Sequence, residues 1–412
     1  MLILHIFFIL SYIYIGELMK KKIIYGIVSI VLLVIGIISY NFTFNKKDDL
    51  LVNADVNLNL SCEAAYLIEE STGKVIYAQN ETKKLFPASM TKMMGLLIVC
   101  ETLQEKQIKK DDIVIISKEA ASMGGSQVFL QPLEQISVDD LIKCVCIASA
   151  NDAMYALSEL IATTNQNFIS MMNEKVKSLN LTNTNFVNVT GFDDPNHYTC
   201  AKDMATIALE LLKYKDIILP YTSMYDSYIR QNTDNPFWLV NTNKMVKFYE
   251  GLDGLKTGYT SKAGFCLTST AKRNEVRLIS VIMKADSSAN RNAMTKTLLD
   301  YGFSKVKAKK LYNKDTIIST IKLDKAKNET IDLYALEDVN LIYEDKLNEK
   351  DIVKEIKLND DFVAPTKKGS IVGYLIIKYD NQEYKHPLIV KEDVESLKVA
   401  ELIGKYLKDI LF

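Results

Sequence analysis

The chain has 412 residues, with 50 basic and 51 acidic side chains, so its net charge is close to zero. This length predicts two or three domains and allows a sizeable apolar core. The balanced charge argues against nucleic-acid binding, as does an arginine content limited to Arg230, Arg273, Arg277 and Arg291, because base-reading proteins usually contain more arginine.

Residues 1–47 are predicted to be a signal or anchor segment outside the folded domains. Lysines at 20–22 precede an uncharged apolar run at 23–42, which lysines at 46–47 close. This is the layout of an export signal, and the run is about long enough to cross the roughly 30 Å hydrocarbon core of a membrane. Because basic residues stay inside, the rest of the chain is expected outside. We therefore expect a protein on the outer face of the cytoplasmic membrane or, if the segment is cut, a secreted one.

The six cysteines would permit disulfides in an exported protein, but their spacing does not resemble a disulfide framework. They are Cys62, Cys100, Cys144, Cys146, Cys200 and Cys266. Cys144 and Cys146 lie two apart in a helical pattern, so they point in different directions and cannot pair with each other. Buried free thiols are the expectation.

The first part of the chain predicts an α+β domain over residues 55–303, after a polar tether at 48–60. Two strands come first, at 64–69 and 75–78 around a glycine turn, and a helix at 89–104 is apolar on every face, which indicates burial. Further helices are predicted at 137–148, 152–162, 167–179 and 201–212, then strands at 265–271 and 277–283, and a helix that ends near 301. Strands at both ends with helices between them predict a sheet closed by both ends of the domain.

The second part, residues 305–390, predicts a small all-β domain. Its strand-like runs are 317–323, 331–336, 339–343, 352–358, 371–379 and 384–390, with turn residues between them. The last segment, 391–412, has apolar residues at helical spacing opposite lysine and glutamate, which predicts an amphipathic helix. Docking on its own domain and lying on the membrane both fit this pattern.

A Ser-x-x-Lys motif is the first of three short patterns with catalytic meaning. The five copies begin at Ser71, Ser89, Ser269, Ser304 and Ser319. Only Ser89 opens a strongly apolar helix, directly after Pro87. Lys92 then lies one turn further on the same face, where burial should lower its pKa below the ordinary value of about 10.4. A neutral lysine can accept the serine proton, so Ser89 is predicted as nucleophile and Lys92 as base; a helix cap with a solvent-directed lysine is the alternative.

The other two patterns are Ser149-Ala150-Asn151 and Lys256-Thr257-Gly258. The first is expected in a loop between two helices, where Ser149 can relay a proton to a leaving amine and Asn151 can hold a substrate amide; an ordinary loop cap is the alternative. The second precedes the late strand pair. Lysine and threonine there suit an anionic carboxylate, and glycine lets the backbone approach a ligand closely.

In this order the three motifs are the signature of penicillin-recognising serine acyl enzymes, and the chain resembles the low-molecular-mass D-alanyl-D-alanine carboxypeptidases. The resemblance runs from about residue 62 to 390. The matching segments are 87–92, 149–152, 188–191, 197–201 and 253–258. It implies a penicillin-binding/β-lactamase-like transpeptidase domain, with an antiparallel sheet and a helical subdomain, followed by a small all-β domain.

The resemblance also implies residue roles. Ser89 would attack the carbonyl between two terminal D-alanines with Lys92 as base, and the backbone N–H groups of Ser89 and Tyr259 would form the oxyanion hole. Ser149 and Lys256 would pass the proton to the departing D-alanine, and water would release the acyl-enzyme. The residues expected to bind substrate are Asn151, Lys256, Thr257, Gly258 and Tyr259.

The implied substrate is a peptidoglycan stem peptide ending in D-Ala-D-Ala, with β-lactams as covalent inhibitors. The expected partners also include the cytoplasmic membrane but no nucleic acid, and no cofactor or metal is expected. Two residues depart from the family pattern. Ala150 replaces the usual glycine of the second motif, and Cys200 replaces a usual threonine, which puts one supporting hydrogen bond in doubt.

Other enzyme classes fit the sequence less well. The histidines are only His5, His197 and His386, which argues against a Ser-His-Asp hydrolase and against a metallohydrolase. A class A β-lactamase would need a Glu-x-x-Leu-Asn loop in its catalytic domain, and residues 55–303 contain none, since Leu179-Asn180 lacks a glutamate at the required offset. A catalytically silent wall-binding scaffold predicts decay of at least one motif, and none has decayed. A related endopeptidase or transpeptidase stays open as the alternative.

Overall fold

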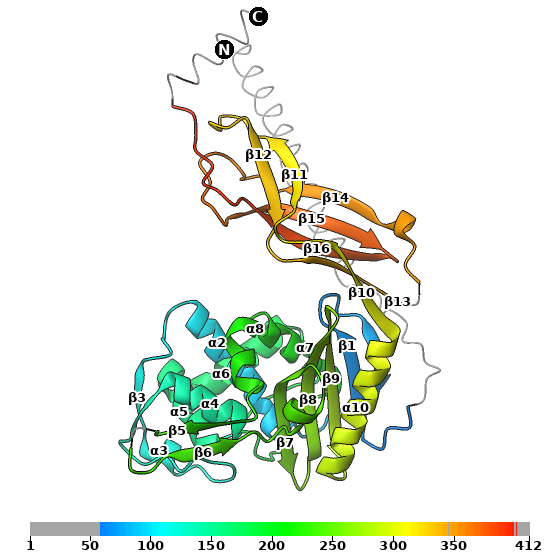
Figure 1. Ribbon diagram of the computed structural model, residues 1–412. Coiled ribbons are helices and arrows are strands. Elements are labelled where there is room, and N and C mark those ends of the chain that lie inside the picture. Colours follow the sequence, from blue (N-terminus) through cyan, green and yellow to red (C-terminus); the bar gives the residue numbers. More distant parts are fainter. Residues whose placement is uncertain (1–57, 232, 345, 399–400, 402–412) are drawn as a thin grey trace, which may run out of the picture. The chain divides into compact units, whose positions relative to one another are not determined.

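The computed structural model describes residues 58–398 and 401, apart from 232 and 345 (Figure 1). The first region contains a five-stranded antiparallel sheet in the order β2-β1-β9-β8-β7. Its strands are β1 (Ala64–Glu69), β2 (Val75–Gln79), β7 (Leu252–Thr260), β8 (Gly264–Arg273) and β9 (Val276–Ala285). The early strand β1 pairs with the late strand β9 in a register from Ala64 opposite Met283 to Glu69 opposite Leu278. The predicted closure of the sheet by both ends of the region is therefore confirmed.

The sheet is covered on both faces, which follows from the alternation of side chains along its strands. In β1, Tyr66 and Ile68 face a core shared with the helices, whereas Ala65 and Leu67 face a second core. That second core includes Leu298 and other residues of α10 (Ser288–Lys305), which packs against β8 and β9. Figure 1 shows α10 on one side of the sheet and most of the remaining helices on the other. A strand that is buried on both faces has a continuous run of apolar residues, as residues 64–68 of β1 do.

The remaining helices lie between β2 and β7 in sequence. They are the 3-10 helix η1 (Ala88–Thr91), α2 (Lys92–Gln104), α3 (Lys118–Ala121), α4 (Val138–Ile147), α5 (Asn151–Ala162), α6 (Asn165–Ser178), α7 (Ala201–Leu212), α8 (Lys215–Thr222) and α9 (Met245–Phe248). Two small hairpins accompany them, β3 (Ile113–Ile115) with β4 (Gln135–Ser137) and β5 (Asp226–Ile229) with β6 (Phe237–Val240). The predicted buried helix is confirmed, since nearly every residue from Lys92 to Cys100 in α2 is buried. The Ser137 hydroxyl accepts from the Asp140 N–H, which is the cap expected for α4.

Two local predictions differ from the structure. The helix expected from residue 89 begins as the 3-10 turn η1, and the α-helix starts only at Lys92. The cause is Ala88, whose φ of 47° breaks the regular helical geometry. Strand β7, which carries the third motif, was not predicted, because two glycines and the lack of apolar alternation weaken its strand pattern.

The second region is all-β, as predicted, and together with the first it confirms the α+β class. A five-stranded sheet has the order β11-β12-β16-β15-β14, and β10 pairs with β13 separately. The strands are β10 (Val306–Tyr312), β11 (Ile317–Lys322), β12 (Thr330–Ala335), β13 (Val339–Glu344), β14 (Val353–Leu358), β15 (Ile371–Tyr379) and β16 (Gln382–Ile389), with a short 3-10 turn η2 (Glu349–Asp351). Strand β10 was missed, since it follows α10 without a turn signal.

The segments expected at the two ends of the chain lie largely outside the described residues. This applies to the signal or anchor at 1–47 and to most of the helix expected at 391–412. Residues 391–398 are described and are not helical, because bridges from Val394 to Thr366 and from Ser396 to Ala326 hold them extended. All six cysteines are free and buried, as expected. Within the described ranges, no helix combines the length and apolarity needed to cross a membrane.

Candidate active site

The first motif forms a sharp turn that brings Ser89 and Lys92 together. The Met90 N–H donates to the Pro87 carbonyl and closes η1. One turn on, Lys92 Nζ lies 2.8 Å from Ser89 Oγ and 2.9 Å from the Thr190 carbonyl oxygen. The lysine is fully buried, whereas the serine is partly exposed. An amine in this position can accept the hydroxyl proton of Ser89 through its lone pair while an N–H donates to Thr190.

The environment of Lys92 favours its neutral form. Burial in the apolar surroundings of α2 lowers its pKa well below the ordinary value, and the nearby Lys256 ammonium lowers it further. The Asp152 carboxylate acts in the opposite direction but is the smaller influence. The predicted lowering of this pKa is confirmed in direction and in its main cause.

A tight turn supplies the carbonyl that receives Lys92. The Asn188 side-chain oxygen accepts from the N–H groups of Thr190, Gly191 and Phe192, at 3.2, 2.7 and 3.1 Å. Gly191 has φ of 92°, and a Cβ there would lie 1.9 Å from the Ala88 carbonyl oxygen. Only glycine lets this turn press against the nucleophile turn. The segment 188–191 belonged to the family resemblance, but the role of the Thr190 carbonyl had no signal of its own in the sequence.

The third motif lies in the edge strand β7, beside the nucleophile turn. A Cβ on Gly258 would approach the Pro87 carbonyl oxygen to 2.7 Å and the Met90 nitrogen to 3.2 Å, so glycine is required for this contact. Lys256 is 1% exposed, and its Nζ donates to the Thr257 carbonyl. Burial lowers the pKa of Lys256 to about 7, and Arg291 contributes in the same direction. Lys256 therefore titrates close to neutral pH.

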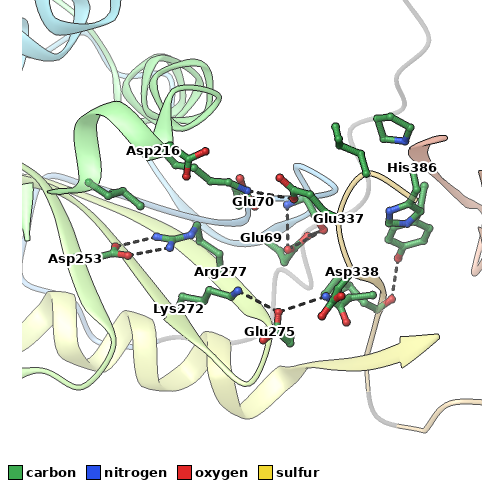
Figure 2. Close-up of a pocket in the computed structure, with 18 of the residues that line it drawn as sticks. Glu69, Glu70, Asp216, Asp253, Lys272, Glu275, Arg277, Glu337, Asp338 and His386 are labelled. Carbon is green, nitrogen blue, oxygen red and sulfur yellow. Dashed lines mark hydrogen bonds and ion pairs between the residues drawn. The ribbon is translucent and has the colours of Figure 1, made fainter. Parts of the chain in front are cut away.

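An ion pair braces the start of β7 against the sheet. Arg277 donates through both terminal nitrogens to the two oxygens of Asp253, each at 2.8 Å, and Nη1 also donates to the Thr270 hydroxyl (Figure 2). Bidentate pairing of this kind fixes orientation as well as distance. The Thr222 hydroxyl donates to the Asp253 carbonyl at 2.7 Å. Strand β7 is thus held to β9, which lies two strands away in the sheet, and to α8.

The second motif lies between α4 and α5, with Ser149 and Asn151 almost completely buried. Ser149 has φ of 62°, a left-handed conformation that is uncommon for serine. Asn151 begins α5; its backbone N–H donates to the Ser126 carbonyl, and its side-chain nitrogen donates to the Gly124 carbonyl at 2.7 Å. Its side-chain oxygen is buried and has no hydrogen-bond partner among the described residues. This oxygen is free to accept from a ligand N–H.

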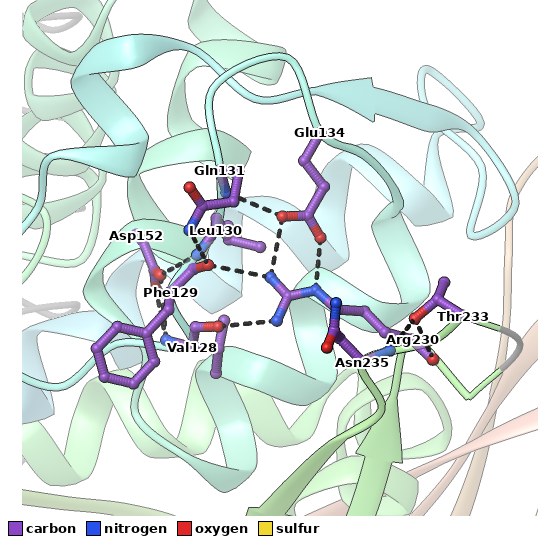
Figure 3. Close-up of polar contacts among 9 residues, drawn as sticks. All are labelled: Val128, Phe129, Leu130, Gln131, Glu134, Asp152, Arg230, Thr233 and Asn235. Carbon is purple, nitrogen blue, oxygen red and sulfur yellow. Dashed lines mark hydrogen bonds and ion pairs between the residues drawn. The ribbon is translucent and has the colours of Figure 1, made fainter.

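Asp152 and Arg230 hold the loop that covers the second motif (Figure 3). The buried Asp152 carboxylate accepts from the N–H groups of Val128 and Leu130, both at 3.1 Å. Arg230 donates to both oxygens of Glu134, at 2.7 and 2.9 Å, and to the Val128 carbonyl at 3.1 Å. Neither residue was singled out from the sequence, because their partners lie far away along the chain.

Two hydrogen bonds through Thr242 connect the second motif with the third. Its N–H donates to the Ile147 carbonyl, two residues before Ser149, and its hydroxyl accepts from Thr257 at 2.7 Å. The structure therefore gathers the three motifs around one centre: Ser89 and Lys92 in direct contact, Gly258 against their turn, and the Ser149 loop tied to Thr257. Tyr259 lies at the rim, 58% exposed, with its ring 4.3 Å from that of Phe265.

The two departures from the family pattern are accommodated. Ala150 has φ of −61° and ψ of 124°, an ordinary extended conformation that does not require glycine. Cys200 is the N-cap of α7, and its sulfur accepts from the Asp203 N–H at 3.4 Å, so the capping hydrogen bond is kept. In the described part of the chain, no group of three or more histidine, cysteine and acidic side chains is arranged to hold a metal ion.

Comparisons with known proteins agree with this geometry. A family model described as D-alanyl-D-alanine carboxypeptidase matches residues 51–287, and one described as Penicillin-binding protein 5, C-terminal domain, matches 307–396. The D-alanyl-D-alanine carboxypeptidase DacF of Bacillus subtilis (strain 168) is 41% identical over 381 residues, which is 92% of this chain and 97% of the relative.

Solved structures give the same result. Penicillin binding protein 5 from Haemophilus influenzae has a TM-score of 0.62 and 30% identity, covering 82% of this chain and 98% of that one. Penicillin-binding protein D2 from Listeria monocytogenes, in its ampicillin-bound form, has a TM-score of 0.54 and 29% identity, covering 60% of this chain and all of that one. The chain therefore belongs to the D-alanyl-D-alanine carboxypeptidase family and is a serine-type D-Ala-D-Ala carboxypeptidase.

Proposed function

We propose that Ser89 is the nucleophile of this carboxypeptidase and Lys92 its general base. The observation that carries this assignment is the 2.8 Å separation of Lys92 Nζ and Ser89 Oγ, with the lysine fully buried and its pKa lowered. Ser89 Oγ attacks the carbonyl carbon between the terminal D-alanines as its proton moves to Lys92. The N–H groups of Ser89 and Tyr259 stabilise the resulting oxyanion, and such donors are each worth about a hundredfold to a thousandfold in rate.

The other motif residues act on the leaving group. Lys256 and Thr257 bind the carboxylate of the terminal D-alanine, and Gly258 lets it approach the strand. Ser149 and Lys256 pass a proton to the departing amine, while Asn151 holds a substrate amide. Water then attacks the ester on Ser89 and releases the shortened stem peptide. A β-lactam also acylates Ser89: the serine oxygen forms an ester with the lactam carbonyl carbon as the ring C–N bond breaks, so penicillin reports on acylation.

The test of these roles is D-alanine release from an acylated Lys-D-Ala-D-Ala peptide, with labelling by fluorescent penicillin alongside. We expect both in the wild-type protein and neither in folded Ser89→Ala. Labelling of Ser89→Ala would show that Ser89 is not the nucleophile. Labelling of the wild type without D-alanine release would favour endopeptidase or transpeptidase activity for this site.

We also propose that residues 23–42 anchor the enzyme on the outer face of the cytoplasmic membrane. The support is the sequence: an uncharged apolar run flanked by lysines. A protein anchored in this way stays in the membrane fraction after a high-salt wash and is digested by protease added to the outside of spheroplasts. Release into the medium would instead indicate a cleaved signal.

A further inference from the structure

His197 is a fully buried ring in the catalytic region that the proposed chemistry does not use. Its Nε2 lies 2.8 Å from the hydroxyl oxygen of Thr91, and its Nδ1 accepts from the Val187 N–H at 3.0 Å. The Phe186 ring packs beside it, with centroids 5.5 Å apart. Both ring nitrogens are therefore engaged, and each by a different segment of the chain.

The hydrogen bonds determine which tautomer is present. A backbone N–H is only a donor, so Nδ1 must present its lone pair to Val187. In the neutral ring the proton is then on Nε2, which donates to Thr91 Oγ1. Burial lowers the pKa of His197 to about 4, against the opposing influence of Asp194 and Asp193, so the ring is neutral at the pH of growth.

The two partners of the ring flank the groups that hold the base. Thr91 lies between Ser89 and Lys92 in the nucleophile turn. Val187 directly precedes the turn whose Thr190 carbonyl accepts from Lys92 at 2.9 Å. A shift of either segment changes the position of Lys92 Nζ between Ser89 Oγ and the Thr190 oxygen.

The backbone around His197 is itself well anchored. Isolated bridges hold the two residues that follow it, joining Tyr198 to Asn185 and Thr199 to Leu85. The Thr199–Leu85 bridge contains two hydrogen bonds, at 2.7 and 2.9 Å. The backbone that carries the His197 ring is therefore held in place by hydrogen bonds. A residue that positions other groups needs such a fixed backbone.

We propose that His197 is a positioning residue for acylation: its neutral ring clamps the nucleophile turn to the 187–191 turn and so sets the geometry in which Lys92 takes the proton of Ser89. This inference rests on the roles proposed above for Ser89 and Lys92. It places the effect of His197 on proton transfer and not on the carboxylate site at Lys256 and Thr257.

The test compares two substitutions at this position. His197→Phe keeps a planar ring but loses both hydrogen bonds, whereas His197→Gln keeps one donor and one acceptor. In the folded full-length enzyme we expect His197→Phe to lower the rate of penicillin acylation and the kcat for D-alanine release roughly ten- to a hundredfold, since small misplacements of reacting groups cost this much. KM should change less than about twofold, because substrate binding groups are untouched. His197→Gln should recover most of the loss.

A double-mutant cycle with Thr91→Val tests the clamp itself. If the ring acts through Thr91, the double variant should be no slower than the slower single variant, because the two residues belong to one interaction. His386→Phe, a change at the partly buried histidine of β16, serves as the matched control and should acylate at the wild-type rate.

Three results would overturn the inference: folded His197→Phe with wild-type kcat, a loss that His197→Gln does not recover, or additive losses in the cycle. If His197→Phe does not fold, the Thr91→Val variant still tests the inference. A wild-type acylation rate in Thr91→Val would exclude the clamp. Penicillin labelling of Ser89→Ala would instead contradict the proposed nucleophile. Failure of the proposed function can therefore be distinguished from failure of the His197 inference.

Discussion

The catalytic region and the C-terminal β region both carry many lysines, but the two motif lysines of the catalytic region lie in an environment opposite to that of the lysines of the β region. Lys92 and Lys256 are buried in the catalytic region, where they form hydrogen bonds to a hydroxyl and to carbonyl oxygens. In the β region, Lys310 and similar lysines lie at the surface against carboxylates. Such pairs are Lys310–Asp338 at 2.6 Å, Lys367–Asp393 at 3.0 Å and Lys391–Asp315 at 2.6 Å.

The comparison shows that environment, and not residue type, decides what a lysine does. Burial lowers the pKa of Lys92 and of Lys256, which suits the first to its proposed role as base and lets the second exchange a proton near neutral pH. The hydrogen bond to Asp338 raises the pKa of Lys310, so that lysine stays charged. Exposed pairs of this kind are screened by solvent and contribute little to stability.

The largest expected effect comes from removing the buried base. Lys92→Met keeps the length of the side chain and its burial but has no lone pair to accept the serine proton. We expect penicillin acylation to fall on the order of 10³-fold or more. Lys310→Met, a matched change at an exposed paired lysine, should leave acylation unchanged. Rapid labelling of folded Lys92→Met would show that another group activates Ser89.

A smaller effect should appear in the pH dependence of kcat/KM. In its proposed role Lys256 binds the substrate carboxylate only when it is protonated, and its pKa is about 7, so we expect kcat/KM to fall as the pH rises above 7. Lys256→Arg keeps the charge to much higher pH. In that variant the alkaline limb near pH 7 should be lost, whatever the absolute rate. An unchanged limb in Lys256→Arg would assign it to a different group.

A third expected effect concerns stability. In the folded state Lys256 has a pKa of about 7, below its unfolded value of about 10.4, so its burial opposes folding below pH 7 and ceases to matter as the pH approaches 10.4. One pKa unit corresponds to about 1.4 kcal/mol, so the cost below pH 7 is on the order of 4 kcal/mol. Lys256→Met should therefore raise the Tm at pH 6, and the gain should shrink towards pH 10. Lys310→Met should show no resolvable change at either pH, and an equal gain from both substitutions would contradict the comparison.

Much of the fold followed from local patterns in the sequence. Alternating or continuous apolar runs located β1, β9 and β15, and the apolar helix α2 was recognised because its composition is unusual on every face. Strand β7 was not predicted, because its glycines are required for close contacts with Pro87 and Thr222. Such contacts produce no periodic pattern in the sequence.

The site was predictable only as far as its chemistry is contained in short motifs. Ser89, Lys92 and Lys256 were found from spacing and context, and the lowered pKa of Lys92 followed from the apolar helix around it. Thr190 acts through its carbonyl, and His197 through partners about ten and a hundred residues away in sequence. Contacts of this kind are set by tertiary packing and have no local sequence pattern.

The pairing of β1 with β9 also determines when the enzyme becomes reactive. Ser89 is synthesised early. Strand β9, which joins β8 and β7 to β1 in the sheet, is made only after every helix from α2 to α9. A nascent chain that already contains Ser89 therefore lacks the neighbours that neutralise Lys92 and accept the substrate. Non-local pairing of this kind forms late in folding. We expect the serine to remain inert until the last strands of the sheet are in place, so that reactivity reports a completed fold.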